Sequence, residues 1–125
     1  MTLLVGMVAD DLTGALDAAA PFAGQGLETV VLISLDSDGA LPADAEVLCI
    51  NTASRELTDG EAAARVTVAT RRLAAAGPRR WFKKIDSRLK GHLAAETSAM
   101  LAVTGLSRAL VAPAEIRNGR RHQGT

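Results

Sequence analysis

The chain has 125 residues, 48% of them hydrophobic, and its 14 basic residues balance 14 acidic ones. This length suits one small domain, and the hydrophobic content is enough for a buried core, which excludes a disordered chain. A neutral chain lacks an overall field that attracts nucleic acid or anionic membrane, so any recognition of an anion must be local.

The first predicted element is a strand at Leu3–Ala9, a continuous apolar run typical of strands covered on both faces. The run from Met1 to Ala9 is too short to span a bilayer and leads straight into Asp10 and Asp11, so we interpret it as a buried strand. An alanine-rich helix is predicted at Leu12–Gly26, where glycine ends it. The chain therefore opens with a βα unit.

Two more strands are predicted at Glu28–Leu35 and Glu46–Asn51, with a polar surface loop between them. Cys49 lies in the second of these strands and is expected to pack in the core. Because it is the only cysteine of the chain, no intrachain disulfide can form, which is typical of proteins in a reducing compartment. The expected location is cytoplasmic.

A second long helix is predicted to begin near Thr58, because Thr58 and Glu61 have the spacing of a capping box. Gly77 and Pro78 should end it, since glycine accepts a left-handed cap and proline cannot continue a helix. Its buried stripe is expected to consist of small and branched residues at helical spacing: Ala62, Val66, Ala69 and Leu73.

The remaining predicted elements are a strand at Arg79–Ile85, a helix at Leu89–Thr104 and a fifth strand at Arg108–Ala112. The inward residues of the helix are expected to be Leu93, Thr97, Met100 and Leu101. Alternating strands and helices with short connections predict an α/β fold. We expect a mainly parallel sheet flanked by helices, in a Rossmann-like three-layer arrangement.

Polar clusters follow the first and fourth predicted strands. The first contains Asp10, Asp11, Thr13 and Gly14, and the second contains Lys83, Lys84, Asp86, Ser87 and Gly91. In a parallel sheet the carboxyl ends of the strands share one edge, where side-chain charges and free N–H groups at helix starts surround a crevice. The two clusters therefore predict an active site that accepts an anion.

Three ordered motifs of the chain resemble the four-carbon acid sugar kinase family. They are Ala9 to Ala15 with Asp17; Thr52, Ser54 and Arg55; and Lys83 to Ser87 with Leu89 and Gly91. The similarity covers essentially the whole chain. It extends to residues that resemble the next loop of the family: Ala112, Pro113, Ala114, Asn118, Gly119 and Arg120.

The resemblance implies that residues 1–125 are part of an amino-terminal sugar-acid-binding domain. It implies a separate carboxyl-terminal domain, absent from this chain, that binds ATP with Mg. The implied activity is phosphorylation of a terminal hydroxyl of a tetronate such as threonate or erythronate. The implied partner is a small sugar acid, not nucleic acid or a membrane, and the family is compatible with a homodimer.

The chain departs from the family pattern at Arg88, Lys90 and His92, where the family usually has threonine, arginine and asparagine. These departures leave the identity of the sugar acid open. The double lysine at Lys83 and Lys84 is closer to the threonate-like branch than to the oxo-tetronate branch.

Phosphoryl transfer to an alcohol requires that the hydroxyl be oriented and lose its proton. Asp11 or Asp10 is the candidate for this task, with Asp86 as the alternative base or as an orienting group. Arg55 offers a planar fork for a substrate carboxylate, and Lys83 or Lys84 offers a compact charge, only one of them pointing into the crevice. The other predicted substrate-binding residues are Thr13, Gly14, Ser54, Ser87 and Gly91.

Other interpretations compete with the kinase prediction. Asp10 and Asp11 could simply cap the first helix, and the cations of residues 83–90 could be solvated surface. A metal-dependent phosphohydrolase would use Asp10 or Asp11 as nucleophile, although adjacent carboxylates diverge on an extended segment. A noncatalytic small-anion binding module is the third alternative.

Several site classes have little support. His92 and His122 lack a third ligand at metal spacing, and one Trp, two Phe and no Tyr cannot form a nucleic-acid stacking platform. No Walker loop or other glycine-rich nucleotide cradle appears. We therefore expect that the chain alone does not turn over ATP.

Overall fold

A parallel β-sheet forms the centre of the molecule. The computed structural model describes residues 3–36 and 39–113. Within them, four strands pair in parallel in the order β2-β3-β1-β4. Their bounds are β1 Val5–Ala9, β2 Thr29–Leu32, β3 Val47–Asn51 and β4 Arg80–Lys84. The predicted α/β class with a parallel sheet is confirmed.

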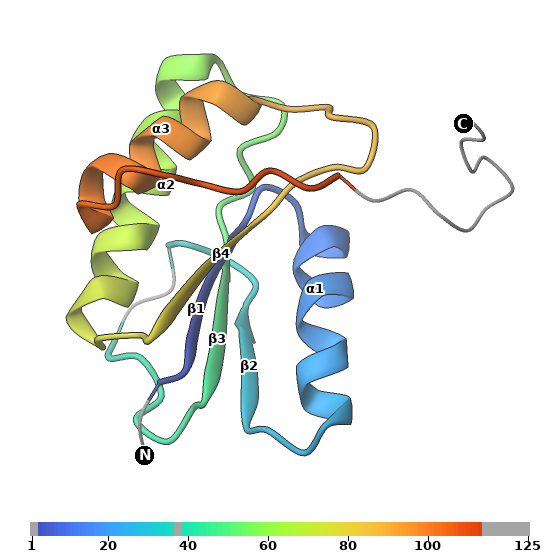
Figure 1. Ribbon diagram of the computed structural model, residues 1–125, viewed down its shortest axis with the longest axis vertical. Helices are drawn as coiled ribbons and strands as arrows, with labels where there is room; N and C mark the ends of the chain where they lie inside the picture. The colour runs from blue at the N-terminus through green and yellow to red at the C-terminus, as the bar shows by residue number, and fades with distance from the viewer. Residues whose placement is uncertain (1–2, 37–38, 114–125) are drawn as a thin grey trace, which may run out of the picture.

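Helices cover both faces of this sheet. Helix α1 (Leu12–Gly24) lies on one side, and α2 (Asp59–Ala75) with α3 (Leu93–Thr104) lies on the other (Figure 1). Two separate apolar clusters fill the layers: Met7, Ala15 and Cys49 belong to the α1 side, while Leu48, Val66 and Met100 belong to the α2 side. None of the helices in the described part of the chain combines the length and apolarity that a membrane crossing requires.

The second helix forms as its sequence predicts. Thr58 Oγ1 accepts a hydrogen bond from Glu61 N, and Glu61 Oε1 accepts one from Thr58 N, which completes the capping box. The predicted inward stripe is fully buried: Ala62, Val66, Ala69 and Leu73. After the helix, Gly77 has a φ of +66°, the left-handed conformation expected of a glycine stop.

Most predicted elements are a few residues longer than the observed ones, and two predictions at the carboxyl-terminal end are wrong. The predicted fifth strand at Arg108–Ala112 is wrong, because this segment has no regular structure. The segment pairs with no strand of the described sheet, and cavities of about 340 and 260 Å³ beside β4 are lined by residues of both β4 and this segment. Helix α3 begins at Leu93 instead of Leu89, because Leu89 and Gly91 have φ values of +60° and +94° that no α-helix accommodates. The predicted family loop at Ala114 and residues 118–120 lies outside the described residues.

The order of the elements defines where a site can form. The chain leaves β1 toward α1 on one face and leaves the neighbouring β3 toward α2 on the other. Adjacent strands whose connections diverge in this way open a crevice beyond their carboxyl ends. Ala9 and Asn51 are partners at that edge, so the residues after them face each other.

Candidate active site

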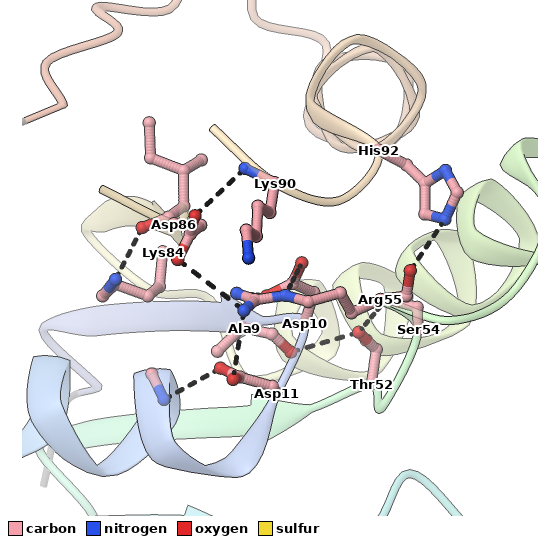
Figure 2. Close-up of polar contacts among 12 residues, drawn as sticks. Ala9, Asp10, Asp11, Thr52, Ser54, Arg55, Lys84, Asp86, Lys90 and His92 are labelled. Carbon is pink, nitrogen blue, oxygen red and sulfur yellow. Dashed lines mark hydrogen bonds and ion pairs between the residues drawn. The ribbon is translucent and has the colours of Figure 1, made fainter. Parts of the chain in front are cut away.

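Arg55 joins the residues that follow β3 to those that follow β1. Its Nη2 lies 2.9 Å from Asp10 Oδ1 and its Nε lies 3.2 Å from Asp10 Oδ2, which makes a bidentate ion pair (Figure 2). The Asp10 side chain is 5% exposed and the Arg55 side chain 22%. The hydrogen bond to Asp10 raises the pKa of Arg55 above its already high ordinary value. The pair is therefore a fixed, largely desolvated part of the crevice.

The other edge of the same guanidinium faces two further carboxylates. Arg55 Nη1 lies 3.4 Å from Asp11 Oδ2 and 3.7 Å from Asp86 Oδ1, and it makes no hydrogen bond to either. Residues from three strand ends therefore converge on Arg55, as expected for a single crevice. Nη1 retains donors that a bound molecule could use.

Asp11 has both a structural and an accessible oxygen. Its Oδ1 accepts a hydrogen bond of 2.9 Å from Gly14 N and caps α1, as the capping interpretation expected. Its Oδ2 is turned toward Arg55, and the side chain is 35% exposed. Asp11 is therefore the most accessible of the three carboxylates, and the capping role does not use its second oxygen.

Asp86 anchors the loop after β4. Its Oδ2 accepts hydrogen bonds from the backbone N–H groups of Arg88 and Lys90, at 3.0 and 3.1 Å. Burial acts to raise the pKa of Asp86, but these two bonds and the nearby Arg55 cation outweigh it and lower the pKa below its ordinary value. A carboxylate with a lowered pKa is a weak base, so Asp86 suits orientation better than proton abstraction.

The two lysines of β4 point to opposite faces, as strand alternation requires. Lys83 Nζ lies 2.9 Å from Glu96 Oε1 on the α3 side. Lys84 lies on the α1 side, where a Cβ on Gly14 would stand 3.4 Å from Lys84 Cγ, and its Nζ donates to Ile85 O. Lys83, Lys84 and Ser87 all line the cavity of about 340 Å³ beside β4.

Ser54 and Glu96 form a buried polar pair behind the crevice. Ser54 is fully buried and its Oγ donates to Glu96 Oε2 at 2.5 Å, so its hydroxyl does not face the crevice in this structure. Glu96 was not among the predicted site residues. Glu96 follows Leu93 by three residues and precedes Met100 by four. This helical spacing was the signal that places it on the buried face of α3.

The glycines and Thr13 have different surroundings. Gly14 donates its N–H to Asp11, while Thr13 is exposed in the first turn of α1. Gly91 lies against Asp10, because a Cβ there would stand 2.5 Å from Asp10 Oδ2. The loop after β4 therefore closes directly over the Arg55 and Asp10 pair.

His92 ties this loop to the connection that carries Arg55. Its Nδ1 contacts Asp59 Oδ1 at 2.5 Å, and its Nε2 lies 3.1 Å from Arg55 O. Both partners are acceptors, so both contacts are hydrogen bonds only when the ring carries two protons. The hydrogen bond to Asp59 is the main cause that raises the pKa of His92 above its ordinary 6.5.

We therefore expect stability to depend on pH through His92. A raised folded-state pKa gives stabilisation that is complete below the unfolded pKa of about 6.5 and is lost as pH rises through the folded value. Thermal melts across this range should show the wild-type melting temperature falling with rising pH more than that of His92→Asn. Both proteins retain His122, which cancels in the comparison. Equal slopes would show that the ring carries no second proton in the fold.

The acidic side chains of the crevice do not fit a magnesium site. Asp10, Asp11 and Asp86 converge on the guanidinium of Arg55, which takes the place that a metal cation would need. In residues 3–36 and 39–113, no group of three or more His, Cys, Asp or Glu side chains could hold a metal ion. Asp10 also lacks a free oxygen for the nucleophilic role that the phosphohydrolase interpretation gives it.

Comparisons with known proteins agree on one family. A family profile described as a sugar-binding N-terminal domain matches residues 5–124. A D-threonate kinase of Cupriavidus necator is 43% identical over 118 residues, which are 94% of this chain and 28% of the relative. A 3-oxo-tetronate kinase of Brucella melitensis is 33% identical over 93% of this chain and 27% of its own length. The chain thus spans less than a third of these curated relatives.

A solved structure agrees with the fold. A protein of Bordetella bronchiseptica, described as a domain of unknown function with bound citrate and as a domain-swapped dimer, superposes with a TM-score of 0.73. It is 39% identical over 82% of this chain and 27% of that one. The two proteins are therefore similar in both sequence and fold.

Proposed function

Because the chain belongs to the family of sugar-binding N-terminal domains, we propose that it supplies the substrate-binding part of an ATP-dependent kinase for a four-carbon sugar acid. The observation that supports this most is the convergence of Asp10, Asp11 and Asp86 on Arg55 at the carboxyl edge of the sheet. The carboxylates can orient the hydroxyl groups of a polyhydroxy acid, and the guanidinium can bind its carboxylate.

In this proposal Asp11 is the base for the acceptor hydroxyl. Its Oδ2 is accessible, whereas both oxygens of Asp10 are held by Arg55. A general base must reach the proton that it removes, which favours Asp11 of the adjacent pair. Asp86, with its lowered pKa, orients a second hydroxyl, and Asp10 keeps the Arg55 fork in place.

The carboxylate of the sugar acid would be met by positive charge on two sides. Arg55 Nη1 offers donors on one side, and Lys84 lies across the crevice on β4. The adjacent cavity of about 340 Å³ lies within the roughly 300–1,000 Å³ typical of ligand pockets. Ser87 lines this cavity. Thr13, Gly14 and Gly91 do not line it, but they stay proposed substrate contacts at the carboxyl edge of the sheet.

ATP and Mg²⁺ would act on the substrate from another part of the whole protein. Bound there, they would supply the phosphoryl group and neutralise its charge, while this chain orients the acceptor hydroxyl.

We also propose a homodimer, which the description of the Bordetella structure as a domain-swapped dimer supports. A cytoplasmic location is proposed because the sequence has a single cysteine, Cys49, and so forms no intrachain disulfide. Burial raises the pKa of the Cys49 thiol to about 12, which makes it unreactive.

Calorimetry on the purified chain tests this function. We expect D-threonate or D-erythronate to bind and ATP not to bind. Threitol, which lacks the carboxylate, should bind much more weakly, because its complex leaves Arg55 Nη1 and Lys84 without an anion. Failure of every tetronate to bind would contradict the proposal.

Two further arms separate the alternatives. Citrate binding as tight as that of the tetronates would favour a general small-anion module. Release of phosphate from phosphosugars in the presence of magnesium would favour a phosphohydrolase. Conversion of ATP to ADP by the chain with a tetronate would contradict the assignment of the nucleotide site to another part of the protein.

A further inference from the structure

A buried carboxylate behind the crevice is unexplained by substrate binding. The Glu96 side chain is 1% exposed and lies between α3, β4 and the connection after β3. Burial of a carboxylate is costly unless cations or hydrogen-bond donors compensate it. Glu96 has one of each: Lys83 Nζ at 2.9 Å from Oε1, in ion-pair rather than hydrogen-bond geometry, and the Ser54 hydroxyl on Oε2.

The contacts continue from Ser54 to the strand that carries the acidic pair. Ser54 Oγ lies 2.7 Å from Thr52 Oγ1, which donates to Ala9 O at 3.1 Å. The backbone follows the same path, because Thr52 N donates to Ala9 O and Ser54 N donates to Asp10 O. Hydrogen bonds thus join Thr52 and Ser54, which precede Arg55, to Ala9 and Asp10.

The backbone between the two hydroxyls is strained. Ala53 has a φ of +50°, the left-handed region that residues with a Cβ rarely adopt. Its N–H donates to Asn51 Oδ1, and the buried hydroxyls of Thr52 and Ser54 hold the residues on either side. Such a conformation persists only where its surroundings hold it. It sets the direction in which the chain enters Arg55.

We propose that Glu96 is a positioning residue for the sugar-acid site. It holds Ser54 from the buried face of α3 and so directs Arg55 onto Asp10. Lys83 compensates the Glu96 charge. This inference rests on the proposed function for its effect on affinity. Its structural step, from Glu96 through Ser54 to Arg55, does not depend on the identity of the substrate.

The test compares Glu96→Gln, Ser54→Ala and the double variant Lys83→Met/Glu96→Leu, with Ser98→Ala on the exposed face of α3 as control. Three quantities are measured: the melting temperature, the Kd for D-threonate and the solvent-exchange rate of the Arg55 Nε–H in ¹H,¹⁵N spectra. The double variant removes both buried charges, so it keeps the fold even where Glu96→Gln unfolds.

We expect each of the three variants to weaken D-threonate binding about 10- to 100-fold, by analogy with the residues that orient metal ligands. The double variant should melt near the wild-type temperature yet exchange its Arg55 Nε–H faster. A purely structural role predicts the opposite, because restored stability would restore both affinity and slow exchange. That result in the double variant would overturn the proposal. If wild type itself fails to bind D-threonate, the exchange rates still decide the positioning step, and only the proposed function is lost.

Discussion

Replacement of Arg55 by alanine is expected to weaken sugar-acid binding about 100-fold and to destabilise the fold by about 3 kcal/mol. The substitution leaves Asp10, 5% exposed, as a buried carboxylate without its cation, and Asp11 and Asp86 without a shared counter-charge. It also removes the Nη1 edge that is proposed to meet the substrate. A loss of about 3 kcal/mol in binding corresponds to about 100-fold in Kd. Chemical denaturation and calorimetry measure the two effects.

Two matched variants separate the charge from the fork. Arg55→Lys keeps a cation but cannot reach both oxygens of Asp10, so it should recover part of the stability and little of the affinity. Arg71→Ala removes an exposed arginine of α2 and should change neither quantity. An Arg55→Ala protein that binds D-threonate like wild type would show that the guanidinium is only a structural counter-ion.

Replacement of Gly91 by alanine is expected to have the second largest effect. Gly91 has a φ of +94°, and a Cβ there would stand 2.5 Å from Asp10 Oδ2. That oxygen cannot move aside freely, because Arg55 Nε holds it at 3.2 Å. The substitution should cost about 3 kcal/mol, from left-handed strain and overpacking together. It should also weaken D-threonate binding, since it pushes the loop after β4 away from Arg55.

Gly26→Ala is the matched control for the backbone term. Gly26 has a φ of +87°, but a Cβ at this position would meet nothing within 4 Å, so its replacement carries the strain without the clash. We expect a loss of about 1 kcal/mol, from left-handed strain alone, and unchanged affinity. Equal losses at Gly26 and Gly91 would mean that the close approach of Gly91 to Asp10 does not matter.

Much of the fold follows from local patterns in the sequence. The capping box of Thr58 and Glu61 and the stripe of α2 are local, and both are confirmed. The edge of the sheet at which Asp10 and Arg55 meet also follows from topology, since the carboxyl ends of parallel strands share one side. The predicted meeting of motifs far apart in the chain therefore needed no knowledge of side-chain contacts.

What the sequence did not reveal depends on tertiary packing. The spacing of Glu96 places it on the buried face of α3, but its polar partners, Lys83 and Ser54, come from other elements and are known only from the tertiary structure. The start of α3 was predicted too early, because the close contact of Gly91 with Asp10 and the positive φ values of Leu89 and Gly91 depend on the tertiary structure. The apolar run at Arg108–Ala112 has the composition of a strand, but whether a segment forms a strand also depends on the edge strand with which it would pair.

We expect the motifs after β1, β3 and β4 to form one crevice for a sugar acid. A titration of the ¹⁵N-labelled chain with D-threonate, followed by backbone amide shifts, tests it most directly. We predict that the largest shifts fall in residues 10–14, 52–55 and 84–91, all at the carboxyl edge of the sheet (Figure 2). Shifts confined to only one of these segments, or to the opposite edge around residues 28 and 46, would contradict the account.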